Sequence, residues 1–301
     1  MVMVLNRDTL NALSRSFRAL VLEAREGYQP LWPRIAAEVP SETRANYYAW
    51  LESLPEVRRW VGERQVQNLA AQTYAIENER FEMTVAVARD DIEDDQIGLY
   101  TPLFRQLGIK AAEHDDKLIF NLLKEGFTAK AYDGKPFFAN DHKIGRRTFS
   151  NRGNVPLTRE NFRQALARMR SLTTDDGSPL GFFYRKPIYL VVGPALEATA
   201  LEIVGVQTLP TGGANPDYQA AEILLSPWLV DSAEPYWFLI DGAQALKPFV
   251  LQRRSRPEWV VRDDPETAEE VFARDVIVYG LRERKAAGYL FWQLAYGSTG
   301  G

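Results

Sequence analysis

The alternation of apolar and polar residues between positions 72 and 89 constrains the fold of this chain more than any other feature. In the stretch QTYAIENERFEMTVAVAR, apolar residues recur with a period of two on either side of the polar tip ENER, at Tyr74, Ile76, Phe81, Met83, Val85 and Val87. Successive side chains of a strand point to opposite faces, so this period predicts a long β-ribbon. A ribbon without a thick core is marginal alone. We therefore expect it to lie on a partner, with an ordinary sheet edge as the alternative.

The first helix is predicted at residues 7–26, where the apolar residues form a single stripe. Asp8 or Thr9 is the candidate N-cap, and Gly27 lies just past the end. A helix with one apolar stripe has to dock on something. Its partner is either its own domain or a neighbouring molecule.

Two more helices are predicted in the first half of the chain. Residues 97–127 form one long helix or two in series, because Gly108 lowers the helix propensity at its centre. His114 lies among acids in the stretch AAEHDDK and is expected to face water. Residues 157–172 form a helix capped by Thr158.

Between the ribbon and the long helix lies an acidic run, DDIEDD, with five acids in the six positions 90–95. A calcium-binding loop needs alternating acids, a glycine at its sixth position and a terminal glutamate. That pattern is missing here, which favours a solvated turn that caps the following helix.

The second half of the chain is dominated by strand patterns. A helix opened by Pro194 runs to Gly205, and the strands are predicted at 187–193, 220–229, 235–242, 248–264, 276–284 and 288–297. Strands and helices do not alternate regularly, so the pattern favours an α+β fold.

Composition excludes whole classes of chemistry. The chain has 301 residues, no cysteine and two histidines, His114 and His142. Disulfides, thiolate nucleophiles and zinc–cysteine sites are therefore excluded, and a two-histidine HExxH site is absent. The net charge of −4 gives no general attraction to nucleic acid or anionic lipid. No apolar run reaches the roughly 18 residues that a membrane helix needs, and we expect no membrane partner.

The stretch AYDGKPFFANDH, residues 131–142, contains the densest group of candidate site residues. A metal site is poorly supported, because no second nitrogen ligand lies nearby in the sequence. The favoured interpretation is a turn with an aromatic anchor, formed by Asp133, Gly134, Phe137, Phe138 and His142. A hydrolase that uses His142 with Asp141 stays open as an alternative at this point.

Five stretches taken together resemble a known family: RFEMTVAVARDDIEDDQIGLY, DGKPFFANDH, a helix followed by PLGF, PIYLVVGPALEATA and DVIVYGLRERKAAGYLFWQLAYG. Over about residues 5–297 the chain resembles the major head subunit of Mu-like tailed phages and prophages. The resemblance implies the α+β fold of Hong Kong 97-type phage capsid proteins. The ranges expected for its parts are an N-terminal arm over 1–53, an extended β-loop over 54–92, a peripheral domain with a spine helix over 93–186 and 249–301, and an axial domain over 187–248.

The resemblance also implies a function. It points to a major capsid protein that self-assembles into pentamers and hexamers of an icosahedral shell around double-stranded DNA, with no catalytic residue, metal or cofactor. The implied partners are many copies of itself, a portal, a decoration protein and weakly bound DNA. A separate scaffold protein is expected, because the family-like region begins close to the first residue. The implied location is the virion, after assembly in the host cytoplasm. The main alternative is an encapsulin-type nanocompartment shell.

In such a shell the arm and the ribbon are expected to complete their packing only among other copies of the chain. Exposed charges would fix register and aromatic side chains would anchor the contact. The basic runs 143–152 and 252–256 are expected to meet neighbouring acids, with DNA as the alternative. The residues predicted to contact a neighbour are Phe17, Arg58, Trp60, Arg64, Tyr74, Glu77 and Arg80.

Overall fold

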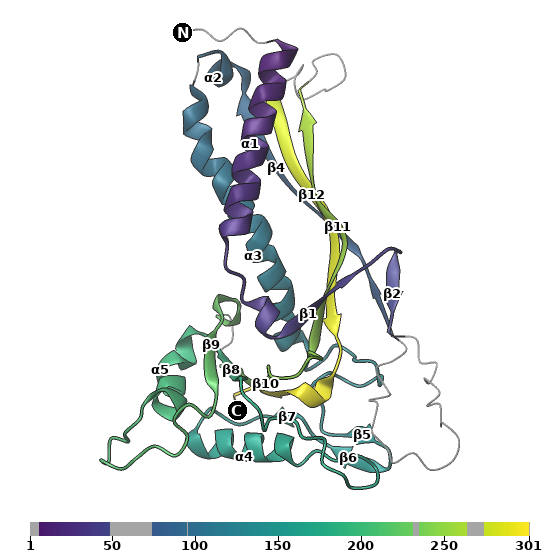
Figure 1. The fold of residues 1–301 in the computed structure, drawn as a ribbon, viewed down its shortest axis with the longest axis vertical. Helices are drawn as coiled ribbons and strands as arrows, with labels where there is room; N and C mark the ends of the chain where they lie inside the picture. Colours follow the sequence, from purple (N-terminus) through teal and green to yellow (C-terminus); the bar gives the residue numbers. More distant parts are fainter. Residues whose placement is uncertain (1–5, 49–73, 95, 231–234, 264–273, 301) are drawn as a thin grey trace.

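The computed structural model describes residues 6–48, 74–94, 96–230, 235–263 and 274–300, which Figure 1 shows as a coloured ribbon. The α-helices are α1 (Arg7–Gly27), α2 (Arg89–Glu93), α3 (Thr101–Glu125), α4 (Arg159–Arg170) and α5 (Glu197–Ala200). Short turns of 3₁₀ or π type are η1 (Trp32–Arg34), η2 (Gln96–Tyr100), η3 (Pro194–Leu196), η4 (Leu201–Gly205), η5 (Pro227–Leu229) and η6 (Trp292–Leu294). The strands are β1 (Ala36–Pro40), β2 (Ala45–Tyr47), β3 (Ala75–Glu77), β4 (Glu79–Ala88), β5 (His142–Ile144), β6 (Arg147–Phe149), β7 (Arg152–Gly153), β8 (Ile188–Val192), β9 (Glu222–Leu225), β10 (Trp237–Asp241), β11 (Phe249–Arg262), β12 (Val276–Tyr289) and β13 (Ala295–Ser298).

A long four-stranded sheet forms the upper, narrow part of the molecule in Figure 1. Its strand order is β1-β11-β12-β4; β11, β12 and β4 are antiparallel, and β1 runs parallel to β11. The helices α1 and α3 lie along one face of this sheet. The mixture of helices and sheets is the α+β architecture expected from the sequence.

The predicted strand pattern at 72–89 is confirmed, but its partner is not another copy. β4 pairs antiparallel with β12 of the same chain, from Ala88 opposite Val276 to Glu79 opposite Lys285. The apolar positions of β4 face the helices, as the period of two requires. The expectation that this strand completes its packing in a neighbour is therefore wrong for β4.

The N-terminal helix also docks on its own chain. Asn6 is its N-cap, with the side-chain Oδ1 accepting a hydrogen bond from the Thr9 backbone N at 2.9 Å, so neither candidate cap was correct. The stripe packs on α3, where the ring of Phe17 stacks on that of Phe104 with 3.9 Å between centroids. The expectation that the arm depends on other copies is wrong for α1, because burial on α3 already satisfies its apolar face.

The long helix α3 is continuous through Gly108. A Cβ at that position would lie 2.2 Å from the backbone oxygen of Val21, so the glycine permits α1 and α3 to approach closely. His114, six residues further on, was expected to face water, but it is half-buried with its ring against that of Phe81 at 4.5 Å. Its position on the sheet side of α3 overrides its acidic sequence neighbours.

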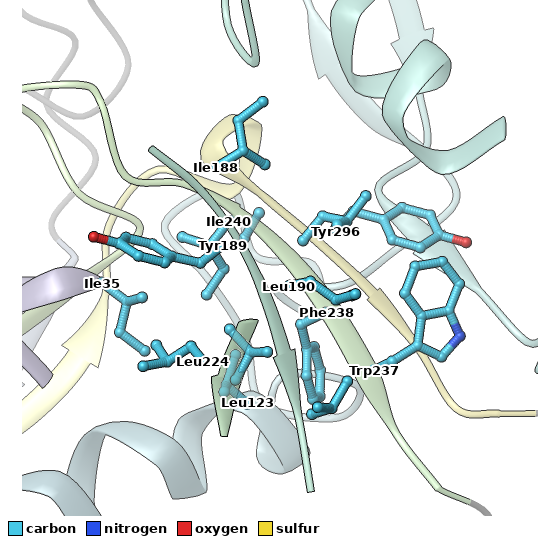
Figure 2. Packing of buried hydrophobic residues seen from close by; sticks show 14 of the residues in the cluster. Ile35, Leu123, Ile188, Tyr189, Leu190, Leu224, Trp237, Phe238, Ile240 and Tyr296 are labelled. Atoms are coloured by element: carbon cyan, nitrogen blue, oxygen red, sulfur yellow. The ribbon is translucent and has the colours of Figure 1, made fainter. Parts of the chain in front are cut away.

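The lower, broad part of the molecule contains a five-stranded sheet in the order β7-β13-β10-β8-β9. Every residue of β8 and β10 is buried, which agrees with their nearly continuous apolar sequences. Figure 2 shows the core on these strands, which contains Leu190 and Phe238 together with Leu123 from the end of α3 and Ile35 from the residue before β1. The helix α4, capped by Thr158 as predicted, covers this part of the molecule.

The five-stranded sheet combines strands from the predicted axial range 187–248 with β7 and β13 from the predicted peripheral range. One hydrophobic core joins them. The predicted boundary at 186/187 therefore runs through a single sheet, and the domain ranges stay predictions.

Candidate assembly site

The stretch 131–142 forms a closed turn whose aromatic residues point inward. Gly134 has a φ of 76°, the left-handed conformation that glycine adopts without strain. The Phe137 and Phe138 side chains are completely buried and contact each other edge to face. The turn therefore attaches the region after α3 to the core of the lower sheet.

His142 is fixed inside the protein rather than presented to a substrate. Its Nδ1 lies 2.6 Å from the carboxylate of Asp133, and its Nε2 lies 3.1 Å from the backbone oxygen of Phe137. The ring stacks on Trp292 at 4.1 Å between centroids. Asp141 is exposed and pairs with Lys135 instead. The pairing of His142 with Asp141 that the hydrolase alternative requires is therefore not formed.

A buried asparagine that sequence reasoning missed holds this region to the C-terminal strand. The Asn151 side-chain amide donates to the backbone oxygens of Phe137, Trp292 and Ala295 at 2.9, 3.2 and 3.1 Å. Its Oδ1 accepts from the backbone N of Ala139 at 2.9 Å. No local motif marks such a residue, because its partners are distant in sequence.

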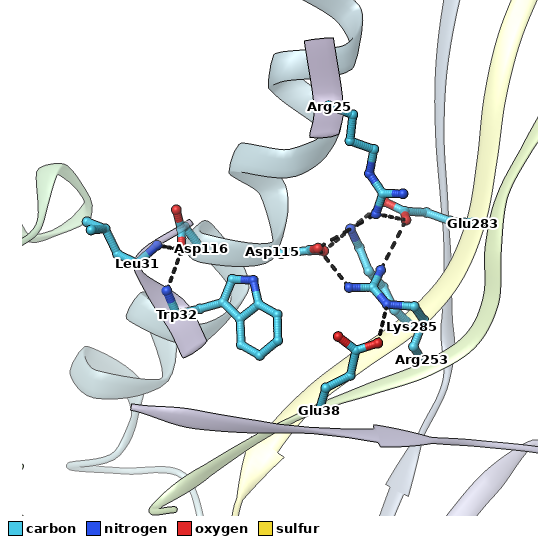
Figure 3. A network of polar contacts seen from close by, with 9 residues as sticks. All are labelled: Arg25, Leu31, Trp32, Glu38, Asp115, Asp116, Arg253, Glu283 and Lys285. Atoms are coloured by element: carbon cyan, nitrogen blue, oxygen red, sulfur yellow. Dashed lines mark hydrogen bonds and ion pairs between the residues drawn. The ribbon is translucent and has the colours of Figure 1, made fainter. Parts of the chain in front are cut away.

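A cluster of six charged residues, with Asp115, Glu283 and Lys285 buried and Glu38 exposed at its edge, joins five elements (Figure 3). Its members are Arg25 of α1, Glu38 of β1, Asp115 of α3, Arg253 of β11, and Glu283 and Lys285 of β12. Three cations balance three anions, so each buried charge has an opposite charge nearby. The cluster requires the ends of α1 and β1, the middle of α3 and the sheet to keep one relative position.

Asp115 lies at the centre of this cluster. Its carboxylate is 2.5 Å from the Lys285 Nζ and accepts a hydrogen bond from Arg253 at 2.9 Å. Burial by itself raises the pKa of Asp115, but Lys285 and Arg253 together outweigh burial and hold that pKa below its ordinary value. The sequence signal for this cluster lies in the stretch LRERKAA. Glu283 and Lys285 interrupt the apolar residues on the inward face of β12 there.

The next residue of α3, Asp116, fixes the link between α1 and β1. One carboxylate oxygen accepts hydrogen bonds from the backbone N of Leu31 and of Trp32 at 2.9 and 2.7 Å, and the other accepts from the Tyr28 hydroxyl at 2.8 Å. Burial raises the pKa of Asp116, and these hydrogen bonds oppose that effect. Two successive aspartates thus hold different parts of the chain against α3.

The predicted inter-subunit residues fall into different environments. Phe17 is buried in the chain's own core, so its side chain is not available to a neighbour. Tyr74 is partly buried, and its hydroxyl accepts from the Tyr289 backbone N at 3.2 Å. Glu77 is exposed and pairs with Arg44 at 3.2 Å, and Arg80 is exposed on β4. Three other predicted contact residues lie outside the described residues: Arg58, Trp60 and Arg64.

The flanks of the predicted extended loop are held together by β2 and β3. Tyr47 and Ala75 are cross-strand partners, so the chain leaves and returns at one place. Buried Gln252 of β11 fixes this base: its amide donates to the backbone oxygen of Ile76 at 3.1 Å and accepts from the Tyr48 hydroxyl at 3.1 Å. The base of the loop is thereby fastened to the four-stranded sheet.

In the described ranges, no group of three or more His, Asp or Glu side chains is arranged to hold a metal ion. The helices in the same ranges are all too short or too polar to cross a bilayer. The candidate assembly site consists of buried polar contacts that hold the elements together and of exposed charged surfaces.

Comparison with known proteins identifies the family of this chain. The family model for the Mu-like prophage major head subunit gpT matches residues 10–155, 148–229 and 230–300. The chain is 30% identical over 303 residues to the major capsid protein of Escherichia phage Mu, which covers 99% of this chain and 76% of that protein. It is also 30% identical over 269 residues to the Mu-like prophage FluMu major head subunit of Haemophilus influenzae, covering 89% of this chain and 66% of that protein.

Solved structures show the same fold. The procapsid of bacteriophage JBD30 matches with a TM-score of 0.63 and 28% identity, over 98% of this chain and 76% of that one. The JBD30 capsid matches with a TM-score of 0.57 and 27% identity, over 75% of this chain and 99% of that one. A virus-like particle from Pyrococcus furiosus, at 9% identity and a TM-score of 0.52, shares the fold alone.

The fold is that of a phage capsid subunit of the Hong Kong 97-like type, as the sequence predicted. Members of this class are structural proteins, so the chain is a shell subunit and not an enzyme. The chain belongs to the family of Mu-like prophage major head subunits, which are major capsid proteins. The nanocompartment alternative is not favoured, because both relatives are phage head proteins.

Proposed function

We propose that this capsid subunit forms rings of five and six copies, and that these rings join into a closed icosahedral shell around double-stranded DNA. A head-to-tail contact between identical subunits produces a closed ring when the rotation from one subunit to the next adds up to a full turn. Many modest contacts then add up to a stable shell through multivalency. The names of the JBD30 relatives, a procapsid and a capsid, support the shell for this chain.

The observation that carries this proposal is the rigid connection between the two ends of the subunit. The cluster around Asp115 fixes α1, β1, α3, β11 and β12 to one another. The lower end of α3 and the residue between η1 and β1 enter the core of the five-stranded sheet, through Leu123 and Ile35. A subunit that contacts neighbours at both ends needs such a connection to set the angle between those contacts.

The extended loop is the second proposed contact. It leaves from the β2–β3 base, which Gln252 fastens to the sheet. We propose that Arg58, Trp60 and Arg64 of this loop, with Glu77 and Arg80 at its base, contact an adjacent copy. The aromatic residue would anchor the contact and the charges would set its register.

The remaining proposed partners follow from the capsid function. A scaffold protein would direct assembly, a portal would admit DNA, and a decoration protein would bind outside. The JBD30 capsid has a form decorated with minor capsid protein trimers, which supports the last of these. Net charge of −4 supports weak contact with DNA, since phosphate binding depends on accumulated cations. Assembly in the host cytoplasm is part of the same proposal.

Negative-stain microscopy of the purified chain, alone and with its scaffold protein, tests this proposal. Rings or closed shells are the expected result in at least one of the two samples. A variant that combines Trp60→Ala with Arg58→Ala and Arg64→Ala tests the loop contact. It should lower the yield of particles while leaving the fold unchanged by circular dichroism. Dispersed single subunits in both wild-type samples would overturn the proposal.

A further inference from the structure

The outer face of the four-stranded sheet is turned away from α1 and α3 and carries two rows of charged residues. In one row opposite charges are paired, and in the other like charges lie together. Phe81, Glu283 and Lys285 point toward the helices, so the alternate positions on β4 and β12 face outward. These outward positions include Arg80 and Arg284. Both rows cross β11, β12 and β4 and can be read from the strand register.

In the first row the arginine has an opposite charge on both sides. Arg282 of β12 lies between Glu258 of β11 and Glu82 of β4, its direct cross-strand partners. Opposite charges in directly opposed positions stabilise a sheet. This row therefore needs no external group.

The second row brings like charges together. Two residues further along β12, Arg284 is directly opposite Arg80 on one side and Ser255 on the other. Like charges in directly opposed positions destabilise a sheet. Arg254 and Arg256 flank Ser255 in the chain and add positive charge nearby.

The second row also contains an unsatisfied donor. The Nε of Arg284 is shielded from solvent and has no hydrogen-bond partner among the described residues. Neither Arg80 nor Arg284 forms a side-chain ion pair within that same part of the chain. A buried donor without a partner is destabilising, and more so when the group is charged. An anion supplied from outside the subunit would remove this cost and the repulsion together.

The same chain presents matching anions on α2 and at its C-cap, at the far end of β4 (Figure 1). Asp90 and Asp94 are both exposed and have no side-chain partner in the described ranges. Their neighbours are already engaged, Glu93 with Arg89 and Asp91 with Tyr100. The two free carboxylates are four residues apart, a spacing that places helical side chains on one face.

These acids cannot reach the arginines of their own subunit. The eight residue-to-residue steps from Arg80 to Ala88 span about 27 Å, because a strand rises roughly 3.4 Å per residue. Asp90 and Asp94 lie beyond that end. Complementary charges that are fixed far apart on one rigid molecule can pair only between copies.

We infer that Arg80 and Arg284 of one subunit bind Asp90 and Asp94 of a neighbouring copy, an ionic contact between capsid subunits. The inference rests on the proposed function, because it requires the chain to associate with itself. It assigns to Arg80 a specific partner, where the sequence predicted only an inter-subunit role. Packaged DNA is the competing source of anions, and the experiment separates the two.

Charge reversal of each side, alone and combined, tests the inference. Three full-length variants are compared with the parent by sedimentation velocity across a concentration series: Arg80→Glu with Arg284→Glu, Asp90→Arg with Asp94→Arg, and all four together. Each one-sided reversal should raise the concentration for half-maximal association by about tenfold or more, since a tenfold change needs only about 1.4 kcal/mol. The fourfold variant should restore association, and the advantage of the parent should shrink at high salt.

Two controls keep the result interpretable. Arg284→Gln should weaken association, whereas Arg282→Gln, on the same face of the same strand, should not, because Arg282 already has a glutamate opposite it on each neighbouring strand. The Asp90 and Asp94 changes lie on the surface, and unchanged circular dichroism melting would show that their effect is not unfolding.

The outcomes are distinct. Association of the parent and equal association of both one-sided variants would overturn the inference and leave the proposed function intact. Loss of DNA retention in the arginine variant, with association unchanged in the aspartate variant, would assign the patch to nucleic acid and also overturn it. A parent that does not associate at all would overturn the proposed function and the inference with it.

Discussion

The completely buried ammonium group of Lys285 lies 2.5 Å from the carboxylate of Asp115, so one charge pair connects β12 to the middle of α3. This pair is the centre of the cluster that holds α1, β1, α3 and the sheet in one arrangement (Figure 3). Such a pair contributes less to net stability than to geometry, because desolvation of the two charges offsets much of their attraction. Its removal on one side only is nevertheless costly.

Lys285→Ala should lower the free energy of unfolding by about 3–5 kcal/mol, since it leaves Asp115 and Glu283 buried with too few cations. Urea denaturation followed by circular dichroism measures this loss. Lys110→Ala is the matched control on α3, where an exposed pair with Glu113 should contribute less than about 1 kcal/mol. The charge-balanced double variant Lys285→Met with Asp115→Leu should lose less than Lys285→Ala alone, and an equal or larger loss would contradict this account.

Stability should fall between pH 6.5 and about 4 because of His114. Burial, followed by the charge of Lys285, lowers the pKa of His114 from 6.5 to about 4. The unfolded chain therefore binds a proton at His114 at a higher pH than the folded chain does, so acid favours unfolding across this window. The pocket around the ring also contains Glu82, Lys110 and Glu283.

His114→Gln should flatten the stability curve in that window by about 1–2 kcal/mol, a value reduced for partial solvent exposure. Urea unfolding at half-unit steps of pH from about 7.5 to about 2.5 provides the measurement. Below about 3.8 both proteins should lose stability further, because the lowered pKa of Asp115 makes its charge pair titrate there. An unchanged slope between pH 6.5 and 4 in the variant would refute the role given to His114.

Gly108→Ala should destabilise the protein, against the usual gain of about 1 kcal/mol for this change inside a helix. The new Cβ would lie 2.2 Å from the backbone oxygen of Val21, so α1 and α3 would have to separate. A loss of about 1–3 kcal/mol is typical of overpacking and is expected here in thermal or urea unfolding. Gly98→Ala, with no atom within 4 Å of its Cβ, is the control that should show no loss.

Asn151→Ala should cost about 3 kcal/mol or more, because it removes hydrogen bonds to several buried backbone groups at once. Asn151→Asp should also destabilise, since a carboxylate cannot donate to the backbone oxygens of Phe137 and Ala295. The exposed Asn154→Ala is the control and should stay within about 0.5 kcal/mol of the parent in urea unfolding. A tolerated Asn151→Ala would show that the turn at 131–142 is held by its aromatic packing alone.

Local pattern was sufficient to predict several strands and helices, but not the short strands β1, β5 and β6, nor the 3₁₀ turn η6 inside the predicted strand 288–297. The period of two found β4, the cap at Thr158 found α4, and the apolar run found β8, because each of these signals is contained in a few consecutive residues. The family resemblance then supplied the fold and the function, which the comparisons confirm.

Partner choice was not predictable in the same way. The stripe on α1 specifies that the helix must dock, but not that Phe17 meets Phe104 of the same chain. The cluster around Asp115 unites residues from position 25 to position 285, so no window of sequence contains it. The environment of His114 was misjudged because its acidic sequence neighbours suggested exposure, whereas its ring packs against Phe81 of β4.

The mass of the particles formed by the purified full-length chain tests the central claim, that this protein is built to associate with copies of itself, most directly. Mass photometry across a concentration series, with and without the scaffold protein, should show species at five and six times the 34.2 kDa subunit mass, and much larger closed shells. A single species at the mass of one subunit under every condition, with the fold intact by circular dichroism, would contradict the account.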